Sequence, residues 1–261
     1  MIEVPDSVLH IFNRDIPVYG ICFFAGIFIA YLMGIPLFKK RNLEPFDLTC
    51  SGVFTMIGAA LGAKVLFIII SWKEIVALKL SLLEIISGGF VFYGGLVGGV
   101  LGLVLYLKIY RLPFQQILDI YAVILPLGHA IGRFGCFCSG CCYGIPYDGV
   151  FNCVYTNPLS TDTPVGVGLF PVQLLEYLML LVLFVVQLLI YVIWNGKPKL
   201  SLKIYLISYS LLRFFLEFLR GDLIRGSFLS VTTSQWISLV ILLAVSLYIL
   251  VDRKSISDHL S

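Results

Sequence analysis

The sequence predicts an all-α membrane protein that crosses the bilayer about seven times. Its 261 residues are 59% hydrophobic and only 13% charged, and the mean hydropathy is +1.00, whereas soluble domains contain about 25% charged residues. Apolar runs long enough to span a bilayer recur along the chain. The alternating pattern of outer-membrane strands is absent. Helices are therefore the expected way to satisfy the backbone in lipid.

The apolar runs place the spanning helices in order. We expect them at residues 17–38, 48–71, 88–107, 117–133, 171–194, 203–220 and 233–251. The N-terminal stretch has no basic region of the kind that precedes a cleavable signal, so the first run is expected to stay as an anchor. The connection at about 134–170 is too polar to span and long enough to suggest a function. We expect one membrane domain over residues 1–261.

The basic residues of the loops predict the orientation, because cytoplasmic loops carry more Lys and Arg. One side has Lys39, Lys40, Arg41, Lys108, Arg111, Lys197, Lys199, Lys203, Arg253 and Lys254. The other side has Arg14, Lys73, Lys79, Arg133, Arg220 and Arg225. This difference predicts an outside N-terminus, a cytoplasmic C-terminus and an outward-facing loop at about 134–170.

The sixth predicted helix carries a stripe of polar groups. It consists of Tyr209, Arg213, Glu217 and Arg220, whose spacings of four, four and three place them on one helix face. Ionisable groups inside a membrane are costly and usually face a cavity or one another. The stripe therefore suggests a functional site. A self-satisfied Arg213–Glu217 pair, with Arg220 reaching to the interface, is the structural alternative.

A second arginine points to the same layer. Arg133 ends the fourth predicted helix, one turn after His129, and Gly132 and Gly135 leave space beside it. Arg133 and Arg213 facing one cavity would suit a phosphate, most simply that of a phospholipid. Interface anchoring of Arg133 and simple packing of His129 are the alternatives. The net charge of +3 shows no basic stripe, so we expect no nucleic-acid partner.

Four of the seven cysteines cluster in a C-x-C-x-x-C-C pattern: Cys136, Cys138, Cys141 and Cys142. A thiolate metal site, a disulfide and plain packing all remain open, although the pattern lacks the second clean pair of a zinc site. Cys22 and Cys50 are expected to pack in the core. Small residues spaced by four, at 58 and 62 and at 94, 98 and 102, indicate close helix packing.

The stretch GRFGCFCSGCCYG resembles the signature of the prolipoprotein diacylglyceryl transferase family. The matching positions are Gly132, Arg133, Gly135, Phe137, Gly140 and Gly144. Further stretches are similar to family motifs in the same order along nearly the whole chain. They contain Tyr19, the glycine-rich run after Tyr93, Asp119, Pro126, Gly128, Pro171, Gln173, Glu176, Tyr209, Arg213, Glu217 and Arg220, followed by TTSQWISL.

The resemblance implies transfer of the diacylglyceryl group of phosphatidylglycerol to the lipobox cysteine of a prolipoprotein. A thioether forms and glycerol phosphate leaves, without a metal or other cofactor. The implied setting is the bacterial cytoplasmic membrane, with the site toward the outer leaflet and with membrane lipid and signal peptides as partners. The implied catalytic residues are Arg213, Glu217, Tyr209, Tyr93 and His129. The implied substrate-binding residues are Arg133, Tyr19, Gly135, Gly144, Arg220, Gln173 and Glu176.

Three positions depart from the family pattern. Tyr93 replaces a histidine, Cys136 an asparagine and Cys141 a glutamate. A tyrosine with an ordinary pKa near 10 is a poor base at neutral pH, so His129 and Glu217 are the alternatives for proton transfer. Two other functions therefore stay open: a lipid-dependent transferase with a different acceptor, and a non-catalytic protein that binds lipid or senses thiol oxidation.

Overall fold

The computed structural model describes residues 2–11, 14–79, 81–193, 200–222, 227–228 and 231–258. Lys197, Lys199 and Arg225, used above for the orientation, lie outside the described residues. The chain divides into two compact units, of which one comprises residues 1–33 and 118–261 and the other residues 34–117. Each unit is described by itself.

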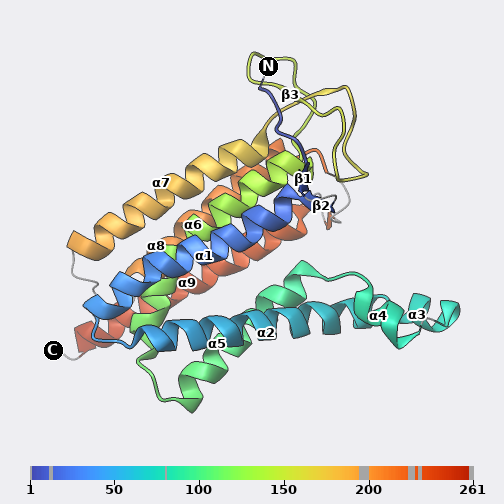
Figure 1. The fold of residues 1–261 in the computed structure, drawn as a ribbon. Coiled ribbons are helices and arrows are strands. Elements are labelled where there is room, and N and C mark those ends of the chain that lie inside the picture. Colours follow the sequence, from blue (N-terminus) through green and yellow to red (C-terminus); the bar gives the residue numbers. More distant parts are fainter. Residues whose placement is uncertain are drawn as a thin grey trace. The chain divides into compact units, whose positions relative to one another are not determined.

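Five helices lie side by side in the first unit (Figure 1). They are α1 (Val18–Lys40, up to residue 33), α6 (Phe114–Ser139, from residue 118), α7 (Val172–Ile193), α8 (Leu200–Leu216) and α9 (Thr233–Asp258). A short 3₁₀ helix, η1 (Glu217–Leu219), extends α8. The long helices overlap the expected spans, because each carries the apolar surface that the bilayer requires. Helices α6 and α9 continue past their expected ends, to Ser139 and Asp258.

Helix α6 is longer at its C-terminal end than the sequence predicted. The expected span ended at residue 133 and the expected loop began at 134, but the helix continues to Ser139. The extra turns bury Cys136, Phe137 and Cys138, so apolar packing sustains a helix where the cysteines and glycines suggested a loop. Gly140 ends it with a φ of +82°, the left-handed conformation that glycine adopts without steric cost.

The loop between α6 and α7 is folded back onto the end of α6. The two-residue strands β3 (Cys153–Val154) and β4 (Gly168–Leu169) pair antiparallel within it. Phe137 packs with Cys153, Tyr155 and Leu169 in a small buried core. The Tyr155 hydroxyl donates to the Phe137 carbonyl at 3.0 Å. These contacts hold the end of α6, where the cysteine cluster lies, in a defined position.

Two further hairpins add short strands to the predicted all-α fold. They are β1 (Val8–Ile11) with β2 (Arg14–Pro17), and β5 (Ser227–Phe228) with β6 (Val231–Thr232). The first hairpin leads directly into α1, and the second leads directly into α9. Both therefore lie at the same end of the bundle as the α6–α7 loop (Figure 1).

The second unit is built on a close pair of helices, α2 (Pro45–Ile70) and α5 (Phe92–Ile109), with α3 (Trp72–Leu78) and α4 (Leu82–Ser87) between them in sequence. A Cβ on Gly98 would fall on the Gly58 carbonyl oxygen, and one on Gly94 would fall on that of Gly62. The glycines thus let the two backbones touch, as the spacing of four predicted.

Six helices among the described residues are long and apolar enough to cross a membrane: α1, α2, α5, α6, α7 and the Thr233–Val251 part of α9. The sequence predicted about seven spans. The remaining helix, α8, has 17 residues and falls just short of the 18-residue length required for that count. The structure therefore supports a multi-pass helical membrane protein with six such helices in the part of the chain that it describes.

The α2–α5 contact predicts a difference between two alanine substitutions. Gly98→Ala should lower the stability by about 1–3 kcal/mol, because its methyl group overlaps the Gly58 carbonyl oxygen. Gly95→Ala is the matched control, since its Cβ would meet Ala59 and Ala63 at an ordinary 3.5 Å. Thermal unfolding in detergent, followed by circular dichroism, should show a lower midpoint for Gly98→Ala alone. Equal midpoints would contradict the close packing.

Candidate active site

A buried ionic cluster joins α6 to α7. Arg133 Nε lies 3.1 Å from Glu176 Oε1 and donates to His129 Nε2 at 3.3 Å. Arg133 and His129 are one helical turn apart near the end of α6, whereas Glu176 is in the first turns of α7. The Glu176 side chain is 2% exposed. A carboxylate at this depth needs a charged partner, and Arg133 supplies it.

Tyr209 of α8 completes this cluster from a third helix. Its ring packs edge-on against the His129 ring, with the centroids 5.3 Å apart, and it stacks on Tyr205 at 5.8 Å. The cluster therefore combines a guanidinium, an imidazole and a phenol. The His129 side chain is 30% exposed and is therefore more accessible than the side chains of Arg133 and Glu176.

A second ionic cluster joins α8 to α9. Arg213 Nη2 lies 2.6 Å from Glu217 Oε2 and donates to the Ser234 hydroxyl at 3.0 Å. Arg213 and Glu217 are both buried, and they form the i,i+4 pair that the sequence suggested as the structural alternative. Arg213 Nη1 is also buried but has no hydrogen-bond partner among the described residues. One donor of the guanidinium is thus available to an anionic ligand.

Arg220 follows η1 and binds an acidic neighbour. Its Nε and Nη2 donate to the two oxygens of Asp222 at 2.8 and 2.6 Å, and the side chain is buried. Its backbone pairs with Gly144 in an isolated antiparallel bridge. A Cβ on Gly144 would fall on the Phe170 carbonyl oxygen. Gly144 therefore lets the α6–α7 loop lie against the end of α8, which is a packing role.

The other expected binding residues surround the end of α6. Gln173 donates to the Cys141 carbonyl at 3.0 Å and to the Tyr155 hydroxyl at 3.3 Å, so its amide nitrogen positions the cysteine loop. Gly135 packs against α1, where its Cβ would meet Cys22 at 2.8 Å and Tyr19 Cα at 3.3 Å. Tyr19 is 41% exposed at the start of α1, beside the end of α6. Tyr93 belongs to the other unit, so it is not placed relative to these residues.

Three contributors to the site were not singled out from the sequence. Ser234 binds Arg213, Asp222 binds Arg220, and Tyr155 supports Gln173. Asp222 is two residues from Arg220 in the sequence, so this ion pair could have been predicted. Ser234 and Tyr155 are contributed by distant segments, and a single sequence contains no sign of those contacts.

The comparisons with known proteins identify the family. The family model described as prolipoprotein diacylglyceryl transferase matches residues 6–251 of the chain. The chain belongs to this family. The resemblance seen in the sequence is thereby confirmed.

Several relatives match over most of their own length. The chain is 32% identical over 238 residues to phosphatidylglycerol–prolipoprotein diacylglyceryl transferase 2 of Clostridium perfringens, covering 90% of each chain. It is 30% identical over 250 residues to the transferase of Clostridium tetani, covering 94% of this chain and 97% of the relative. It is 33% identical over 237 residues to that of Finegoldia magna, covering 90% of each.

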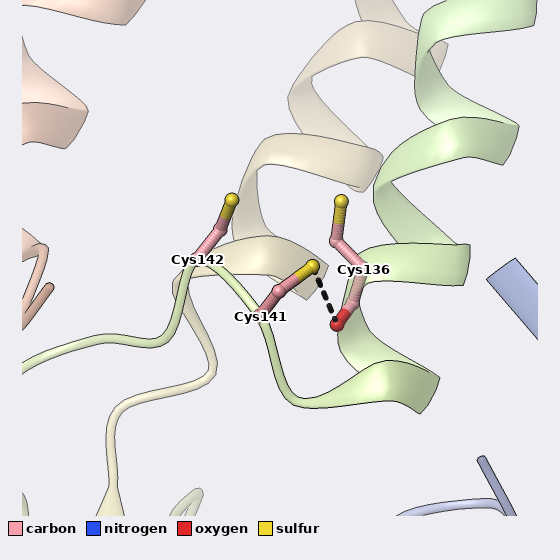
Figure 2. A group of neighbouring side chains, drawn as sticks. All are labelled: Cys136, Cys141 and Cys142. Atoms are coloured by element: carbon pink, nitrogen blue, oxygen red, sulfur yellow. Dashed lines mark hydrogen bonds between the residues drawn. The ribbon is translucent and has the colours of Figure 1, made fainter. Parts of the chain in front are cut away.

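This member of the diacylglyceryl transferase family gathers three thiols beside the ionic clusters. The sulfur atoms of Cys136, Cys141 and Cys142 all lie within 4.8 Å of one another (Figure 2). The Cys141 thiol donates to the Cys136 carbonyl at 3.9 Å. Hydrogen bonds with Cys136 and Cys141, and then the charges of Arg220 and Arg133, lower the pKa of the Cys142 thiol. The hydrogen bond with Cys136 also lowers the pKa of the Cys141 thiol, but its hydrogen bond with Cys142 and its burial outweigh this effect, so that this pKa is raised. No disulfide joins any of the seven cysteines. The group has the soft donors and spacing to hold a thiophilic metal ion.

The Arg133–Glu176 interaction predicts a measurable coupling. Glu176→Gln should lower the free energy of unfolding by about 3 kcal/mol or more, because it leaves a buried guanidinium without its anionic partner. Adding Arg133→Gln should cost less than the sum of the two single substitutions. Denaturant unfolding in mixed micelles would measure all four proteins. Exposed Glu74→Gln is the control and should change little. Additive losses would contradict the pairing.

Proposed function

We propose that this protein transfers the diacylglyceryl group of phosphatidylglycerol to the lipobox cysteine thiol of prolipoproteins. The names of the relatives describe this donor and this acceptor. The observation that supports the reaction most directly is the buried guanidinium of Arg213, whose Nη1 has no partner among the described residues. A buried, unsatisfied cationic donor favours an anionic ligand.

The reaction requires charge stabilisation at the leaving group. The acceptor sulfur forms a bond to a glyceryl carbon of the lipid, while the bond from that carbon to a phosphate oxygen breaks and its electron pair stays on the phosphate. Glycerol phosphate leaves with this added negative charge. Arg213 and Arg133 would hold the phosphate and stabilise that charge. Their partners Glu217 and Glu176 keep the two guanidinium groups oriented before the lipid binds.

The acceptor thiol must also lose its proton, because the thiolate is the nucleophile. Glu176 and Glu217 are each engaged in an ion pair with an arginine. His129 is more accessible, and a proton could reach its Nε2 once this nitrogen gives up the hydrogen bond that it accepts from Arg133. Among these side chains His129 is therefore the proposed proton acceptor. Tyr209 would position its ring.

Membrane placement forms part of the proposal. Helix α8 has 17 residues and η1 adds three, which together make about 30 Å of helix. This length matches the hydrocarbon thickness of a bilayer and supports a seventh crossing. Seven crossings and the loop charges favour an outside N-terminus and a cytoplasmic C-terminus in a bacterial cytoplasmic membrane. Arg133, Glu176 and Arg213 would then face the outer leaflet, where an exported signal peptide arrives.

One observation favours a second candidate. Cys136 and Cys141 replace the asparagine and glutamate of the family motif, so the site that receives the acceptor differs chemically from the family pattern. A transferase with the same lipid donor and another acceptor fits this difference. A non-catalytic protein that binds lipid or senses thiol oxidation is the further alternative.

Mass spectrometry of a lipobox peptide tests the proposal. The purified protein in phosphatidylglycerol vesicles should add a diacylglyceryl group to the peptide cysteine. Arg213→Ala should reduce the rate by about 100-fold or more, since it removes a donor to the charge that develops on phosphate. Arg14→Ala, on an exposed strand, is the control and should retain the rate.

The same assay separates the alternatives. Lipid binding that persists without adduct formation would favour another acceptor or a binding role. Phosphatidylglycerol binding that is unchanged by Arg133→Ala and Arg213→Ala would contradict the assignment of these arginines to the phosphate.

A further inference from the structure

The three thiols at the end of α6 form a site that neither the family motif nor the ionic clusters explain. Cys136 is on the last turns of α6, and Cys141 and Cys142 follow the turn at Gly140 (Figure 2). Cys142 adopts a left-handed φ of 62°, a conformation that costs a non-glycine residue about 1 kcal/mol or more. The backbone thus turns sharply enough to bring three sulfurs from a seven-residue segment together.

The sulfur positions are close to those of a metal site. A tetrahedral ion with bonds of about 2.3 Å to thiolates separates the sulfurs by about 3.8 Å. The observed separations are all within 4.8 Å, so side-chain rotation that shortens the longest by about 1 Å would complete the geometry. A disulfide could join only two of the three sulfurs and would leave the third thiol beside it.

The surroundings suit an anionic complex better than neutral packing. Arg133 and Arg220 interact electrostatically with Cys142, and Arg133 also with Cys141. Three thiolates with a divalent ion carry one net negative charge, and the Arg133 and Arg220 guanidinium groups lie near it while also pairing with Glu176 and Asp222. Gln173 and Gly144 hold the backbone of the segment, through the Cys141 carbonyl and the Arg220 bridge. The ligands are therefore supported by outer contacts, as in metal sites.

We propose that Cys136, Cys141 and Cys142 bind a zinc ion as three thiolates and leave its fourth coordination position open. Three protein ligands with an open position are typical of zinc that acts on a substrate, whereas structural zinc has four. The motif spacing leaves a thiolate metal site open but lacks the second clean pair of ligands that a structural zinc site needs. In a site with an open position, no fourth protein ligand is required.

If the proposed function holds, the open position would take the lipobox thiol. A thiol that binds zinc loses its proton, so the acceptor would be a thiolate without a strong base. Its proton passes to His129 or water, its sulfur forms a bond to the glyceryl carbon, and the bond from that carbon to the phosphate oxygen breaks, so that glycerol phosphate leaves with the electron pair. The thioether formed is neutral and a weaker ligand, so the product can leave zinc. This arrangement would replace the lost asparagine and glutamate with a different way to activate the acceptor.

Metal binding can be measured independently of transfer. The purified full chain should contain about one zinc per chain by elemental analysis, and Co²⁺ should produce thiolate charge-transfer absorption. Cys136→Ser, Cys141→Ser and Cys142→Ser should each weaken Co²⁺ binding by more than about 100-fold, since losing even an outer contact costs 10–100-fold. Cys138→Ala is the matched control: it is two residues from Cys136, on another helix face, and should bind normally. Circular dichroism would establish that each variant is folded.

Several results would overturn the metal site. One is a purified protein that contains no zinc and shows no thiolate absorption when Co²⁺ is added. Another is thiolate absorption that persists in the triple serine variant. Binding of Cu⁺ alone, or a stable disulfide within the cluster, would also contradict the zinc site. The proposed function can fail separately. If zinc binds as described but no peptide adduct forms in any condition, the metal site is supported and the proposed transfer is refuted.

The role of the open position has its own test. Addition of a lipobox peptide should change the Co²⁺ spectrum, and a peptide with serine in place of the cysteine should not. Removing zinc with a chelator should lower adduct formation at least 10-fold, and adding zinc should restore it. Adduct formation at the full rate without zinc would overturn the assignment of the acceptor thiol to the metal.

Discussion

The site depends on the requirement that charges buried in an apolar bundle have partners. Arg133 pairs with Glu176 between α6 and α7, and Arg213 pairs with Glu217 and binds Ser234 of α9. An unpaired charge at such a depth would cost several kcal/mol. The ionic contacts therefore restrict how these helices can be arranged, and they also hold two guanidinium groups in fixed orientations.

The ends of α6, α7 and α8 meet where these charges are concentrated. The α6–α7 loop packs its own core of Phe137, Cys153, Tyr155 and Leu169 against the end of α6. The same loop pairs with the segment after η1 through Gly144 and Arg220. This backbone support is dense, so small displacements of the cysteine segment are opposed by several contacts. The proposed site would benefit from such support.

The thiol cluster changes how the family site is interpreted. An asparagine and a glutamate offer hard oxygen and nitrogen groups, whereas cysteines offer soft sulfur ligands. Two of the three altered positions, Cys136 and Cys141, lie within one cluster with Cys142. Their joint replacement is easier to understand as one chemical change than as unrelated losses. Arg133 and Arg213, by contrast, retain the groups that suit a phosphate.

The amino-acid sequence alone predicts the helical membrane class, the approximate positions of the long helices, the resemblance to the family and, as one alternative, an Arg213–Glu217 pair. Each follows from composition, from spacing along one helix or from a motif, all of which are local. The folded chain was needed to show that Glu176 pairs with Arg133, that Ser234 binds Arg213, that α6 continues to Ser139, and that three of the four clustered cysteines converge. These features depend on which helix faces meet and how a turn is packed, and a single sequence does not encode them in any local pattern.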